Sequence, residues 1–176
     1  MWRDPPVSNT GPWPALPGRP RASLAAVQAG DLVQPIVAAT PQMSLLDAAV
    51  GFAGAGLPGL VVVDGHDRLL GVLPGSALVR LGLPQYVLDD PALAGVLDES
   101  ASHLLTARLT TLSVADALAD EEPDPHPQVE VSATLVEVAS VMAREQVGLV
   151  VVIDGDGRVL GVVTAVALLA AVLPEA

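Results

Sequence analysis

The chain has 176 residues, with 20 acidic residues against 8 arginines, a net charge of −12, no lysine and no cysteine. This length fits one ordinary domain, and 51 % hydrophobic residues exclude wholesale disorder. The acidic balance excludes a nucleic-acid partner, because phosphate binding needs a basic face. Without cysteine or lysine, disulfides, thiolate metal sites and Schiff-base chemistry are also excluded.

The chain begins with a proline-rich segment. Residues 1–22 contain six prolines together with Trp2 and Trp13. Proline removes a backbone donor and breaks helices and central strands. We therefore expect residues 1–22 to form a flexible arm.

A first structural unit is predicted over residues 23–82. After a short extended piece at 36–39, Ser44 and Asp47 have the spacing of a helix capping box. Apolar residues at i, i+3, i+4 and i+7 behind Ser44 predict a helix. Two apolar runs, 60–63 and 69–73, flank a Gly- and Asp-rich turn and predict a β-hairpin. A second helix is predicted at 76–81.

A helical insert is predicted over residues 83–112. Asp90 and Pro91 mark the start of a helix with proline in its first position, ending near Glu99. Residues 100–109 are predicted to form a second helix.

The last unit is predicted over residues 113–176. Ser113 and Asp116 have the capping-box spacing and predict a short helix. The elements of the first unit then recur: an extended piece at 128–131, a box at Thr134 and Glu137, a hairpin over 149–153 and 159–163, and a helix at 165–173. The apolar stretch 159–173 is too short for a bilayer span of about 20 residues. We therefore expect a cytoplasmic protein that is not membrane-embedded.

The two units are an internal repeat. A shift of 90 residues aligns 45–78 with 135–168 without a gap, and 13 of the 34 positions are identical. The identical positions include Asp, Gly and Arg residues, which a chance match of two apolar segments would not keep in step. The repeats predict a mixed α/β (α+β) fold of two βαββα units.

The repeated pattern resembles the CBS domain. Residues 154–164, DGDGRVLGVVT, follow the family's pattern of Asp, Gly-Arg, apolar pair, Gly, apolar pair and Thr, and residues 64–73 follow it slightly less well. The resemblance implies a tandem CBS pair in which the two repeats are related by a pseudo-twofold axis and their sheets pack together. It also implies a regulatory role without catalysis, and clefts between the repeats that bind AMP, ADP, ATP or S-adenosylmethionine.

The resemblance further implies where a ligand would bind. Carried onto the second repeat, the cleft comprises Thr164, Val163, Gly161, Ala167 and Val129. In the family, a hydroxyl after the last strand and an Asp three positions later contact the nucleotide. Thr164 is in place here, but Ala167 stands where the Asp belongs.

The first repeat departs further from the family's nucleotide site, because it has Pro74 and Ala77 at the two positions. We therefore expect a degenerate site with weak binding at best. Thr164 has a second interpretation, as the N-cap residue of the following helix.

Two function classes follow from these observations. The first is a regulatory module that binds a small ligand, with an adenosine nucleotide in a degenerate site as the candidate, and modulates a partner enzyme or transporter. The alternative is a ligand-free interaction or assembly subunit. No catalytic residues are identified, and the three histidines lack the spacing of metal ligands. The last helix is apolar on nearly all sides, so a homodimer through the repeat helices is expected.

Overall fold

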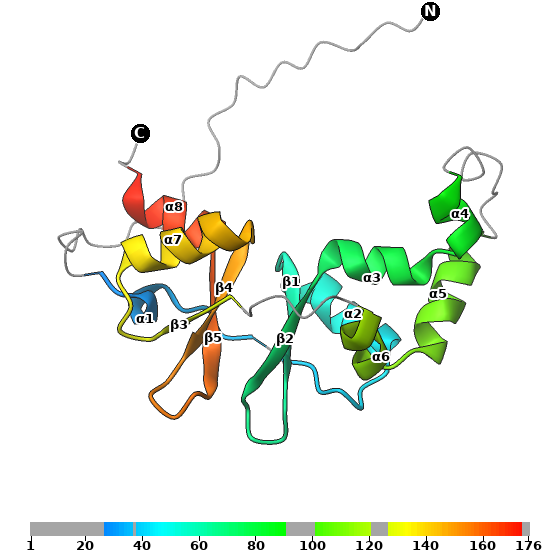
Figure 1. Ribbon diagram of the computed structural model, residues 1–176, viewed down its shortest axis with the longest axis horizontal. Helices are drawn as coiled ribbons and strands as arrows, with labels where there is room; N and C mark the ends of the chain where they lie inside the picture. The colour runs from blue at the N-terminus through cyan, green and yellow to red at the C-terminus, as the bar shows by residue number, and fades with distance from the viewer. Residues whose placement is uncertain (1–26, 37, 91–100, 121–126, 174–176) are drawn as a thin grey trace, which may run out of the picture.

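The computed structural model describes residues 27–36, 38–90, 101–120 and 127–173. Two halves lie side by side, with a β-hairpin at the bottom of each and helices above (Figure 1). The predicted α+β class is confirmed. The predicted arm, residues 1–22, and the predicted helix starting at Pro91 lie outside the described residues.

The repeated elements have nearly the predicted bounds. The first half contains α2 (Leu45–Ala55), β1 (Gly59–Val63), β2 (Leu69–Pro74) and α3 (Gly75–Gly82). The second half contains β3 (Gln128–Glu130), α7 (Leu135–Glu145), β4 (Leu149–Ile153), β5 (Val159–Thr164) and α8 (Ala165–Val172). Every helix and strand from α2 to α3 therefore recurs 90 residues later, as the sequence repeat predicts.

The sheets differ in one strand. β1 pairs with β2, and β4 pairs with β5, both antiparallel. β3 adds a parallel strand beside β4, with Val129 opposite Val152. At the equivalent place in the first half, the described residues form no strand. Ala39 alone forms a β-bridge there, with Val62. The predicted extended piece at 36–39 thus contributes a bridge at Ala39 to the sheet of the first half.

The helix caps follow the predicted side-chain pattern at two of three places. The Glu137 amide donates to Thr134 Oγ1 (3.3 Å), and the Thr134 amide donates to Glu137 Oε2 (2.7 Å). Ser113 and Asp116 exchange the same pair of bonds at the start of α6 (Val114–Asp120). Ser44 Oγ accepts from the Asp47 amide, but the Ser44 amide does not donate to the Asp47 carboxylate in return, so this capping box is only half formed.

The aspartates that recur in the repeat close the hairpin turns. Asp64 Oδ1 accepts from the amides of His66 (2.8 Å) and Arg68 (2.9 Å). Asp154 Oδ1 accepts in the same way from the amides of Asp156 and Arg158, both at 2.9 Å. These bonds account for both aspartates as turn residues.

The hairpins of the two halves pack face to face. Residues alternate along β1 and β4, so that one face of each strand contacts its own helices and the other contacts the opposite half. The residues of this shared seam are Val61, Val63, Leu149, Val151 and Val162. The seam explains why these strands are apolar on both faces and not alternating.

Each repeat is completed by a helix from outside it. The short helix α1 (Ala29–Leu32) lies with the second half, and α6 lies with the first half, as their colours show in Figure 1. Ala29 and Leu32 belong to the core of the second half, and Val114 and Ala117 to that of the first. The predicted sequence ranges 23–82 and 113–176 remain predictions, and the chain crosses between halves at both helices.

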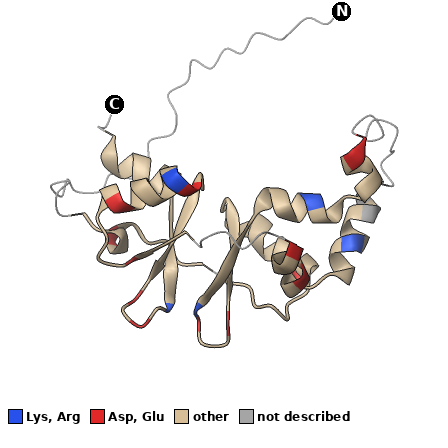
Figure 2. Ribbon diagram, in the orientation of Figure 1, with Lys and Arg blue, Asp and Glu red and all other residues tan. Residues whose placement is uncertain are grey.

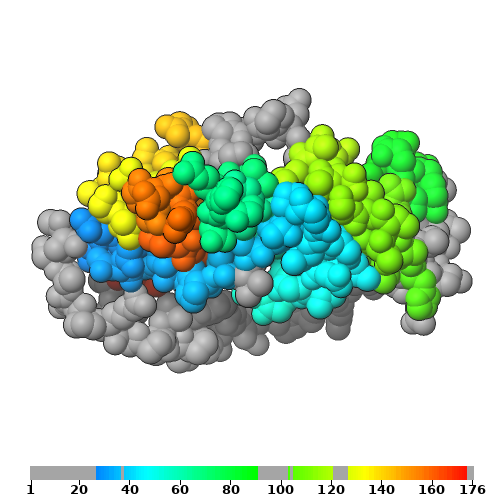
Figure 3. All heavy atoms as spheres, turned by 90° about the horizontal axis from the view of Figure 1, so that it is seen from below, coloured from blue at the N-terminus to red at the C-terminus, as the bar shows by residue number. Residues whose placement is uncertain are grey.

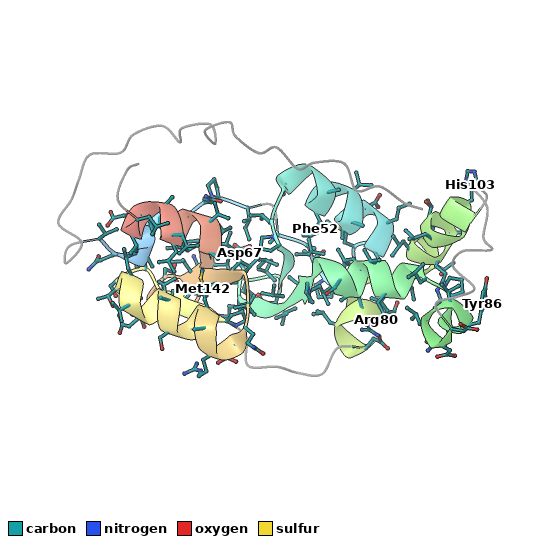
Figure 4. All side chains as sticks on the ribbon, turned by 90° about the horizontal axis from the view of Figure 1, so that it is seen from above. Phe52, Asp67, Arg80, Tyr86, His103 and Met142 are labelled. Atoms are coloured by element: carbon teal, nitrogen blue, oxygen red, sulfur yellow. The ribbon has the colours of Figure 1, made fainter. Side chains whose placement is uncertain are left out.

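The helical insert extends the first half. It contains α4 (Gln85–Asp89), which the sequence analysis missed, and α5 (Ala101–Thr111), which agrees with the predicted helix at 100–109. Leu109 of α5 is buried in the core of the first half. Figure 4 shows α7 and α8 side by side, and Tyr86 and His103 at the far end of the first half. No helix in the described part of the chain has the length and hydropathy needed to cross a membrane.

Candidate ligand-binding site

A groove of about 400 Å³ lies between the two repeats at the hairpin end of the molecule. Figure 3 shows this end, where the turns of both hairpins lie side by side. The first half supplies Ile36, Ala38, Thr40 and the β1–β2 turn, and the second half supplies Val159 and Leu160. A cavity of this size falls in the range of small-molecule sites.

The groove has both apolar and acidic lining residues. Ile36, Ala38 and Leu160 are apolar, while Thr40, Asp64 and Asp67 bring a hydroxyl and two carboxylates. The Arg68 and His66 amides that donate to Asp64 hold its pKa below the ordinary value, so this group is ionised at neutral pH. The hydroxyl and the two carboxylates suit a ligand with hydroxyl or amine donors, and the carboxylates disfavour a phosphate group.

The sequence analysis missed this groove. Its lining comes from three segments far apart in the chain, and none of the five predicted site residues is among them. Val159, at the start of β5, lines the groove, while Thr164 lies at the other end of the strand. No spacing in the sequence indicates which residues of different repeats become neighbours.

Thr164 and Ala167 lie together at the start of α8. Thr164 is the N-cap residue, and its hydroxyl accepts from the Ala167 amide at 3.2 Å. The N-cap interpretation of Thr164 is therefore confirmed, while ligand contact stays a prediction. Both side chains are half-buried, so position 167 retains some access to solvent.

The other three predicted residues are inside the fold. Val163 is fully buried and Val129 is 9 % exposed, and both side chains belong to the core of the second half. Gly161 is buried against the main chain of Gln34, whose amide donates to the Val162 carbonyl at 2.8 Å.

The equivalent position in the first repeat is closed. Ala77 is 3 % exposed in α3, and Pro74 precedes that helix without a side-chain cap. A carboxylate at position 77 would be buried without a partner, which is costly. The described residues also contain no group of three or more His, Cys, Asp or Glu side chains that could hold a metal ion.

Comparison with known proteins identifies the fold. The model of the CBS domain matches residues 29–83 and 122–174. No curated protein matches the chain. A CBS domain-containing protein from Kribbella flavida DSM 17836 is 33 % identical, with a TM-score of 0.69 over 82 % of this chain and 97 % of that one.

A more distant relative is CBSX2 from Arabidopsis thaliana, which is 21 % identical, with a TM-score of 0.61 over 81 % of this chain and 91 % of that one. A structure of CBSX2 in complex with AMP is also 21 % identical, with a TM-score of 0.57 over 81 % and 93 % of the two chains. At these identities the likeness concerns the fold alone. With both repeats matched by the family model, the chain belongs to the CBS domain family and carries two CBS domains in tandem.

Proposed function

We propose that this chain is a regulatory binding module, which takes a small ligand between its two CBS domains and thereby modulates a partner enzyme or transporter. The observation that carries the proposal is the groove between the repeats. Its walls come from both halves, so a ligand there touches both at once. Such a ligand shifts the molecule towards the arrangement of the two halves to which it binds more tightly.

An adenosine-type ligand is the first class to test. CBSX2, which shares the fold, is known in complex with AMP. In this chain the hydroxyl of Thr164 already accepts from an amide, and Ala167 offers no carboxylate. We therefore expect AMP, ADP, ATP and S-adenosylmethionine to bind weakly, no tighter than about 100 µM, a free energy near −5.5 kcal/mol.

The second candidate function is a ligand-free assembly subunit. It is favoured by the helix surfaces, where several large apolar side chains are exposed on α3 and α8. Those of α8 are Val166 (70 % exposed), Leu169 (53 %), Val172 (46 %) and Leu173, which follows the helix (61 %). α8 itself carries no charged residue (Figure 2). We propose that a second copy of the chain covers part of this surface.

Calorimetric titration separates the two functions. AMP, ATP and S-adenosylmethionine are each titrated into the wild-type protein up to millimolar concentration. Binding with a Kd of 0.1–1 mM supports the regulatory module with a degenerate site. Absence of binding by all three favours the assembly subunit. A low-micromolar Kd for AMP contradicts the degenerate site and favours a dedicated adenosine sensor.

A matched pair of variants tests whether the groove is the site. Leu160 and Leu70 are equivalent in the two repeats and similarly exposed, at 44 % and 38 %, but the groove includes only Leu160. Leu160→Trp should fill the groove and abolish the thermal stabilisation by the ligand, while Leu70→Trp should preserve it. If both variants respond as wild type does, the ligand binds elsewhere.

A further inference from the structure

The helices α1 and α6 occupy equivalent places in the two halves, because their first residues make equivalent main-chain hydrogen bonds. The Val114 amide donates to the Met43 carbonyl at 3.0 Å, and the Ala29 amide donates to the Ala133 carbonyl at 2.8 Å. Met43 and Ala133 are 90 residues apart, as the repeat requires, whereas Ala29 and Val114 are 85 apart. A spacing of 85 residues therefore relates the segments that lead into the two repeats.

Each half has a hydrophobic core between its strands and its helices. With the two spacings, these two cores can be aligned almost completely, residue by residue. Nine of the ten buried residues in the core of the first half have a counterpart in the core of the second. The pairs are Ala39 and Val129, Leu45 and Leu135, Ala48 and Val138, Leu60 and Val150, Val62 and Val152, Leu73 and Val163, Leu78 and Leu168, Val114 and Ala29, and Ala117 and Leu32. The tenth is Leu109 of α5, which has no counterpart among the described residues.

The position equivalent to Leu109 holds a leucine. Leu109 precedes Val114, so the spacing of 85 residues places Leu24 in its role. The neighbouring pair supports this register, because Leu112 packs against the core of the first half and its equivalent, Val27, packs against that of the second. Val27 is thus already at the second core when the chain enters the described region.

The equivalent helices α3 and α8 differ in how much of their surface is covered. α5 packs against α3, and no described helix takes the same place on α8. Gly82 of α3 is buried, and a Cβ added there would lie 2.7 Å from Leu105 of α5. Its equivalent in α8 is Val172, which is 46 % exposed, and Leu173 beside it is 61 % exposed. The C-terminal end of α8 therefore has an apolar surface where α3 has a packed helix.

We propose that Leu24 occupies the place in the second half that Leu109 holds in the first, so that residues 23–26 pack over α7 and α8. The cover includes the C-terminal end of α8. Residues 23–26 and α8 carry no charge themselves, but charge attracts the N-terminal segment as a whole, because residues 1–26 contain three arginines and one aspartate while the rest of the chain is strongly acidic. Pro17 and Pro20 exclude a continuous helix like α5 and confine the contact to the short piece after Pro20.

The exposed apolar surface of α8 then has two parts, one covered by residues 23–26 and one left open. Val79 of α3 is 56 % exposed beside α5, and its equivalent Leu169 is 53 % exposed. Residues 23–26, placed as α5 is, would leave Leu169 and Val166 uncovered. These two remain available to a second copy, so the inference does not depend on the proposed function or on any ligand.

Cysteine labelling tests the contact directly, since the chain has no cysteine of its own. Single variants Leu24→Cys, Leu109→Cys and Leu16→Cys are reacted with a thiol reagent under native conditions at two protein concentrations a hundredfold apart. We expect Leu24→Cys to react at least about tenfold more slowly than Leu16→Cys, as Leu109→Cys should, at both concentrations. Equal rates for Leu24→Cys and Leu16→Cys overturn the proposal. Protection lost on dilution also overturns it, because a second copy would then be the cover.

Thermal unfolding provides a second measurement on the full chain. Leu24→Ala should lower the Tm by about 5–15 °C, similarly to Leu109→Ala, while Leu16→Ala should change it by less than about 2 °C. An unchanged Tm for Leu24→Ala overturns the proposal.

Discussion

Gly161 of β5 lies directly against the main-chain carbonyl of Gln34, a residue between α1 and α2 in the sequence. The Gln34 amide donates to the Val162 carbonyl (2.8 Å), and the Val162 amide donates to the Gln34 carbonyl (3.0 Å). These bonds hold the segment after α1 against the outer edge of the second repeat's sheet. The glycine that the repeat conserves at this position therefore makes room for the chain's own backbone.

Gly161→Ala should consequently destabilise the protein. A Cβ at this position overlaps the Gln34 carbonyl, so the segment must shift, and we expect a loss of about 1–3 kcal/mol in the free energy of unfolding. Gly155→Ala is the control, because no atom lies within 4 Å of the added Cβ. Urea denaturation measures both, and equal stability of the two variants would contradict the close approach.

The two repeats also differ at the end of their first long helix. Gly56 follows α2 with φ +64°, and its equivalent Gln146 follows α7 with φ +52°. Because a side chain disfavours this left-handed conformation, Gly56→Ala should cost about 1 kcal/mol, and Gln146→Gly should stabilise by up to about 1 kcal/mol. Gly54→Ala, inside α2 with open space around its Cβ, should instead stabilise by about 0.5–1 kcal/mol. Thermal denaturation should give opposite signs for Gly54→Ala and Gly56→Ala, and equal signs would be inconsistent with the helix ending at Gly56.

The turn aspartates predict an acid-sensitive stability. The pKa of Asp64 is lowered chiefly by the Arg68 amide, and that of Asp154 chiefly by the Arg158 amide. A lowered pKa in the folded state stabilises the protein above the unfolded-state pKa of about 3.9, and this contribution disappears as the pH falls through the folded-state pKa. The stability of wild type should therefore decrease below about pH 4.

The double variant Asp64→Asn, Asp154→Asn should lose less stability than wild type between pH 7 and pH 3, as followed by urea denaturation. Asp156→Asn removes a carboxylate that accepts none of the turn's recorded hydrogen bonds, so it should keep the pH dependence of wild type. A double variant as acid-sensitive as wild type would assign the effect to other groups.

Position 167 should accept a carboxylate, and position 77 should not. Ala167 lies half-buried in the first turn of α8, where a negative charge is favourable, whereas Ala77 is 3 % exposed. Ala167→Asp should retain the wild-type Tm and tighten AMP binding about tenfold, equal to about 1.4 kcal/mol. Ala77→Asp should lose about 1–3 kcal/mol of stability without any gain in affinity.

Calorimetry and thermal unfolding of these two variants and wild type decide the outcome. No gain in affinity from Ala167→Asp would mean that the start of α8 is not the nucleotide site, leaving the groove or the assembly function.

Local signals in the sequence determined the repeated elements. The boxes at Thr134 and Ser113, the β-branched runs and the turn at Asp154 all depend on residues within a few positions of one another. Their hydrogen bonds are consequently visible as spacing, and the repeat made each prediction twice. The half-formed box at Ser44 and the reduction of strand 36–39 to a bridge at Ala39 are the exceptions.

Only the tertiary structure decided which segments meet. Ala29 completes the core of the second half and Val114 that of the first, although each precedes the other repeat. Gly161 and Val163 read in the sequence as cleft residues, but one is covered by Gln34 and the other is in the core. The groove that joins Thr40 and Asp67 to Leu160 depends on the packing of two hairpins. Such contacts link residues about a hundred positions apart. Burial of the shared apolar seam stabilises them, and β1 and β4, which supply most of the seam, are apolar at every position, so no periodic pattern in the sequence indicates which residues will meet.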